Sequence, residues 1–125
     1  MPADVTDFRE TLRKLSVRDG AYVDRVLVDD LANEQASHLD AKTHALVRVG
    51  ALVALDAATP SYVEAIGSAR SWGASADEIV GCLIAVLPAV GIARVVSAAP
   101  KIGLGLGYDV DAALEAPATP APDAL

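Results

Sequence analysis

The sequence predicts an all-α protein of about six helices. Its 125 residues fit one domain, and no stretch alternates apolar and polar residues as a half-buried strand would. Hydrophobic residues make up 53% of the chain but aromatic residues only 4%, which excludes a disordered chain and indicates a core of Ala, Val, Leu and Ile. Surplus apolar helix faces are typical of subunit contacts, so we expect a homo-oligomer.

The first half of the chain predicts three helices. Within residues 4–16, apolar side chains recur at helical spacing, and Gly20 then breaks the pattern. Residues 21–36 predict a second helix. Asp40 is placed to cap a third helix over 41–57, which is apolar on most of its surface and therefore belongs in a core or an interface.

A fourth helix is marked at both of its ends. Thr59 is a good N-cap and Pro60 suits the first helical position, so the helix is expected from Pro60 to about Trp72. Gly73 supplies the C-terminal glycine that commonly ends a helix.

The remaining elements follow a capping box, S-x-x-E, formed by Ser75 and Glu78. This box opens a fifth helix from residue 76 to about residue 87, and Pro88 and Gly91 predict a kink or break before a sixth helix to about residue 99. The glycine-rich KIGLGLGYDV that follows lacks the spacing of a phosphate-binding loop, so we expect a close backbone crossing. We expect one domain over 1–115 and a mobile Pro/Ala-rich tail over 116–125.

Net charge and the distribution of apolar residues argue against several classes of function. A net charge of −7 argues against nucleic acid and against anionic membrane surfaces as partners. The longest apolar run, residues 79–93, is shorter than a membrane span and contains Pro88. Because the N-terminus is acidic and polar, it does not resemble a signal peptide, and we expect a cytoplasmic protein.

Three segments, in order, carry a resemblance to a known family. They are LDAKTHALVRVGALVALDA from Leu39, then AIGSARSWGASADEIVGCL, then LPAVGIARVVSA up to residue 98. Residues 39–99 resemble the carboxymuconolactone decarboxylase family, which includes the alkylhydroperoxidase-like proteins. The resemblance implies an all-α domain that assembles into dimers, trimers or hexamers.

The redox branch of that family carries C-x-x-C-x-x-x-H at the start of the helix that ends in A-x-x-x-G. Counting back from Ala69 and Gly73, the two cysteine positions hold Ala58 and Ser61, and the histidine position holds Ala65. The acidic position further upstream holds Leu46. A dithiol peroxidase needs an attacking and a resolving thiol, and the only cysteine, Cys82, is expected as inert buried filler. Alkylhydroperoxidase activity is therefore the least favoured hypothesis.

The decarboxylase branch needs no cysteine, although it tends to carry the histidine that Ala65 replaces. His44 and Arg48 lie four residues apart and share a helix face. Arg48 could anchor a substrate carboxylate, and His44 could transfer a proton. Alternatively, both residues line a subunit interface or reach solvent. If Arg48 is buried, its charge needs a partner, which could be Asp56, Glu64, a neighbouring subunit or a ligand.

Three residues of the fourth helix complete the candidate site. Glu64 could act as a general base if burial raises its pKa, or it could simply stabilise the positive end of its helix. Ser61 and Tyr62 could line a substrate site, and Tyr62 is also expected as a packing group. Arg94 and Lys101 could add positive charge to a pocket or merely stabilise helix C-termini.

The leading hypothesis is cofactor-independent decarboxylation or proton transfer on a small carboxylate or lactone, a reaction class taken from the resemblance. The alternative is a non-catalytic homo-oligomer that kept the fold and lost the site. No cofactor is expected. No metal is expected either, because the two histidines are six residues apart and no carboxylate or cysteine cluster accompanies them.

Overall fold

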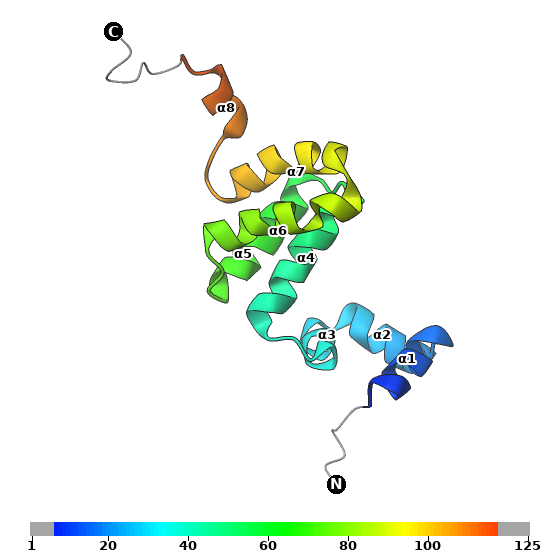
Figure 1. Cartoon of the computed structure of the whole chain (residues 1–125). Helices are drawn as coiled ribbons and strands as arrows, with labels where there is room; N and C mark the ends of the chain where they lie inside the picture. The colour runs from blue at the N-terminus through cyan, green and yellow to red at the C-terminus, as the bar shows by residue number, and fades with distance from the viewer. Residues whose placement is uncertain (1–6, 118–125) are drawn as a thin grey trace. The chain divides into compact units, whose positions relative to one another are not determined.

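The computed structural model describes residues 7–117 and contains eight α-helices and no strand within them (Figure 1). The all-α prediction is confirmed, but the expected count of six helices is too low. Contacts divide the chain into two units, Met1–Asp40 and Ala41–Leu125. The single domain over 1–115 stays a prediction, and residues 118–125 of the expected tail lie outside the described part.

Unit 1 contains α1 (Phe8–Ser16), α2 (Gly20–Val28) and α3 (Asp30–Ser37). Each helix begins after an aspartate whose carboxylate accepts a hydrogen bond from a backbone N–H of the first turn: Asp7, Asp19 and Asp29. The prediction of one helix over 21–36 is wrong because Asp29 adopts extended backbone angles and caps α3 through the Ala32 amide, at 3.1 Å.

Unit 2 contains α4 (Ala41–Leu55), α5 (Thr59–Ser71), α6 (Ala76–Val90), α7 (Ile92–Gly105) and α8 (Val110–Glu115). Helix α5 begins at Thr59 itself after Ala58, which makes no side-chain cap, so the predicted Thr59 cap is wrong. The capping box of Ser75 and Glu78 is confirmed, and both of its hydrogen bonds measure 3.0 Å.

The core of unit 2 lies where α4 to α7 pack on one another (Figure 1). Helix α4 packs against α5 and α6, and α7 covers α5 and α6. The fully buried side chains come from all four helices, and the largest are Tyr62, Ile66, Ile79, Ile102, Val49 and Val53. These residues are aliphatic except for one tyrosine, as the composition predicts.

The break between α6 and α7 occurs at Gly91, whose φ of +88° favours glycine. Helix α7 continues through Pro100 to Gly105 instead of ending near residue 99. The predicted close crossing in the glycine-rich segment is confirmed, because a Cβ on Gly103 would lie 2.7 Å from the Tyr108 carbonyl oxygen.

Candidate functional site

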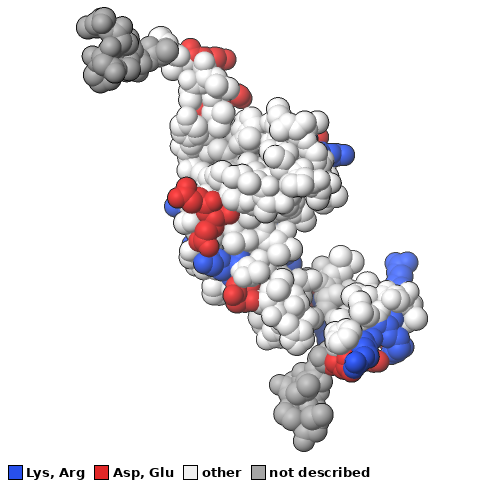
Figure 2. All heavy atoms as spheres, viewed as in Figure 1, with Lys and Arg blue, Asp and Glu red and all other residues white. Residues whose placement is uncertain are grey.

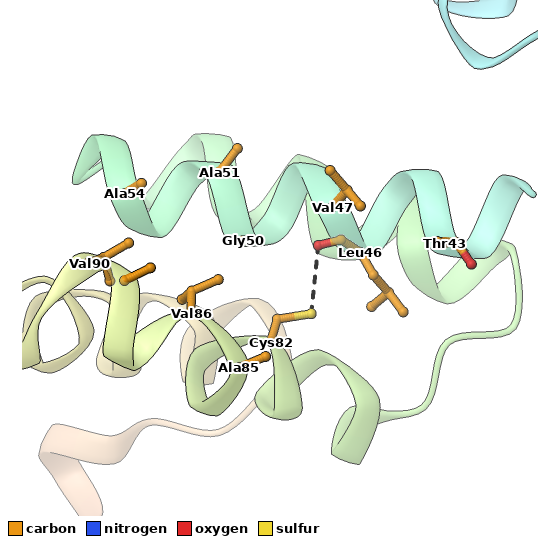
Figure 3. Close-up of a pocket in the computed structure, with 11 residues that line it drawn as sticks. Thr43, Leu46, Val47, Gly50, Ala51, Ala54, Cys82, Ala85, Val86 and Val90 are labelled. Carbon is orange, nitrogen blue, oxygen red and sulfur yellow. Dashed lines mark hydrogen bonds between the residues drawn. The ribbon is translucent and has the colours of Figure 1, made fainter. Parts of the chain in front are cut away.

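An open apolar groove of about 520 Å³ runs between α4 and α6 (Figure 3). The two helices come close together at Gly50, where a Cβ would lie 3.2 Å from the Val86 side chain. Small side chains leave the groove empty along much of its length. It is lined by Thr43, Leu46, Val47, Gly50, Ala51, Ala54, Cys82, Ala85, Val86, Ala89 and Val90.

The groove offers almost no polar chemistry beyond the Thr43 hydroxyl and the Cys82 thiol. The thiol faces the Leu46 carbonyl oxygen at 3.6 Å (Figure 3) and the Glu78 carbonyl oxygen at 3.5 Å, and can donate to either. Burial raises the pKa of Cys82, so the thiol stays protonated near neutral pH. Cys82 therefore behaves as a half-buried packing group with a satisfied donor, and not as an activated nucleophile.

The start of the groove is fixed by an ion pair. Lys42 at the beginning of α4 lies 2.9 Å from the carboxylate of Glu78 in the first turn of α6. Backbone hydrogen bonding at Ser75 and then Lys42 lower the pKa of Glu78, so this carboxylate stays charged. Both side chains are partly exposed, so the pair adds little to stability.

None of the five predicted site residues lines this groove. On α4, His44 is half-buried and Arg48 is exposed, while their neighbours Thr43 and Val47 turn into the groove. Arg48 is therefore not a charge buried in the core of unit 2.

The three predicted residues of α5 do not share one face. Ser61 and Glu64 are exposed, whereas Tyr62 is fully buried in the core. Tyr62 is thus a packing residue of unit 2, whereas Ser61 and Glu64 face solvent.

A polar cluster that the sequence did not predict joins the α4–α5 turn to α7. Ser97 donates a hydrogen bond of 2.7 Å to Asp56, and Lys101 donates one of 2.9 Å to the Ala57 carbonyl oxygen. The Lys101 ammonium also lies 3.5 Å from the Asp56 carboxylate. The Ser97 hydrogen bond lowers the pKa of Asp56, so this carboxylate is too weak a base to activate the Ser97 hydroxyl as a nucleophile.

The charge of Asp56 in this cluster acts on the buried Tyr62. Burial, and then the negative charge of Asp56, raise the pKa of the phenol. Its hydroxyl has no hydrogen-bond partner among the described residues. A sequence signal for the cluster did exist, since Ser97 and Lys101 are four residues apart on one helix, but nothing in the sequence linked them to Asp56.

No family model, curated protein or solved structure matches this chain. The resemblance of residues 39–99 to the carboxymuconolactone decarboxylase family therefore stays a prediction. Within residues 7–117, no group of three or more His, Cys, Asp or Glu side chains is placed to hold a metal ion. Among the same residues, no helix combines the length and apolar character needed to cross a membrane.

Proposed function

We propose that this chain is a homo-oligomeric helical protein in which the α4–α6 face of one copy packs against a second copy. The observation that carries the proposal is the apolar groove itself, which is open to solvent between α4 and α6. Val47, which lines it, exposes 56% of its surface. Apolar surface gathered in this way is typical of an interaction site.

Charge favours a second copy as the occupant. Copies of a chain with net charge −7 repel one another, except where the meeting surfaces carry no charge. No charged residue occurs from Ile79 to Ala93, which includes most of α6. Figure 2 shows a broad uncharged surface over α6 and α7. Two copies that meet on such a face bury no like charges.

The shape of the face also favours self-association. A two-fold interface requires one surface to supply both the protruding groups and the hollows that receive them. The α4–α6 face offers both, because the large exposed side chain of Val47 lies at a groove that also has small residues such as Gly50, Ala51 and Ala85. The family resemblance supports the same reading, since it implies dimers, trimers or hexamers.

The experiment compares two matched variants by light scattering after size exclusion and by sedimentation. Val47→Glu places a charge in the groove, at a side chain that is already solvent-exposed in one copy. Val63→Glu is the control, because Val63 on α5 is similarly exposed but lies outside the groove. At roughly 100 µM, Val47→Glu should have a lower assembled mass than wild type, and Val63→Glu should not. Equal masses for the two variants, or a monomeric wild type, would contradict the proposal.

The second candidate is proton transfer on a small carboxylate or lactone, with Arg48 as anchor and His44 or Glu64 as the proton-transfer group. It is supported by the packing of α4 on α5 and by the position of Arg48, Glu64 and Ser61 at the solvent-exposed surface of these helices. Arg48→Ala should then abolish turnover of a carboxylate substrate and leave the assembled mass unchanged. Unchanged turnover would reject Arg48 as the anchor.

A further inference from the structure

We draw no further inference here: the strongest candidate, the surface of exposed apolar side chains on α1 to α3 of unit 1, which include Phe8, Leu12, Leu27 and Leu31, is an unpartnered apolar surface, and nothing in the described part of the structure shows what covers it.

Discussion

Gly103 and Tyr108 approach so closely that no side chain fits between them. A Cβ on Gly103 would lie 2.7 Å from the Tyr108 carbonyl oxygen and 2.8 Å from the Val110 side chain. The Tyr108 amide donates a hydrogen bond of 2.8 Å to the Gly103 carbonyl oxygen. This contact sets the path of the chain from α7 into α8.

Gly103→Ala should lower the free energy of unfolding by about 1–3 kcal/mol, because the added methyl group meets backbone that cannot yield cheaply. Urea unfolding followed by circular dichroism measures the change. Gly67→Ala is the control: Gly67 lies inside α5 with nothing within 4 Å of its Cβ position. That variant should gain about 0.5–1 kcal/mol from helix propensity. A loss at Gly67 equal to that at Gly103 would show that steric contact is not the cause.

The crossing at Gly103 is an example of what the sequence could predict, because repeated glycine signals a close approach by itself. The same holds for Ser75 and Glu78, whose capping box depends only on residues three apart. The helix start at Asp29 could not be predicted in the same way, because an aspartate can lie within a helix or begin one. Helix α3 packs against α2, and this contact is not visible in the local sequence. The sequence predicts that the sixth helix ends near residue 99, yet α7 continues through Pro100 to Gly105.

The candidate site shows a different limit. Thr43 and Val47 turn into the groove, while His44 and Arg48, one residue further along, do not line it. The sequence predicts α4 and the helical spacing of its side chains, but it does not show on which side α6 packs. The α4 residues that face α6 therefore could not be identified. The contact of Ser97 with Asp56 spans 41 residues and leaves no local signal.

The Asp56–Ser97 hydrogen bond predicts a pH dependence. This bond, and then the charge of Lys101, lower the pKa of Asp56 below its ordinary value of 3.8 in the folded state. The unfolded chain therefore binds more protons in acid, so the bond's stabilisation is present above about pH 4–5 and is lost as the pH falls through the folded pKa.

Ser97→Ala removes the largest cause of that shift. Urea midpoints should be lower for Ser97→Ala than for wild type between about pH 5 and 7, and the two should converge as the pH falls through the lowered pKa of Asp56. The comparison between the proteins removes the contributions of Glu10 and Glu78, whose pKa values are also lowered. A constant difference at every pH would assign the effect to packing instead of to Asp56.

Tyr62→Phe tests the buried phenol. Its hydroxyl is fully buried and has no hydrogen-bond partner among the described residues. A buried hydroxyl without a partner destabilises the folded state, and removal of the oxygen relieves that cost. We expect the free energy of unfolding to rise by about 1 kcal/mol, measured by urea unfolding. Tyr108→Phe, at an exposed tyrosine, is the control and should change little. Destabilisation by Tyr62→Phe would mean that a partner, such as a bound water, occupies the site.

The Cys82 thiol reports on the groove directly. Its raised pKa keeps it protonated, so alkylation by iodoacetamide at pH 8 should be slower than for free cysteine and should accelerate as the pH rises. If a second copy covers the groove, Val47→Glu uncovers the thiol and should speed alkylation well beyond the rate in Val63→Glu. The carboxylate added at position 47 lies in the same groove and can only raise the pKa of the thiol, which slows alkylation, so a faster rate in Val47→Glu reports access and not acidity. Identical rates in the two variants would mean that the groove is open in the assembled protein and that its small residues serve only the close packing of α4 on α6.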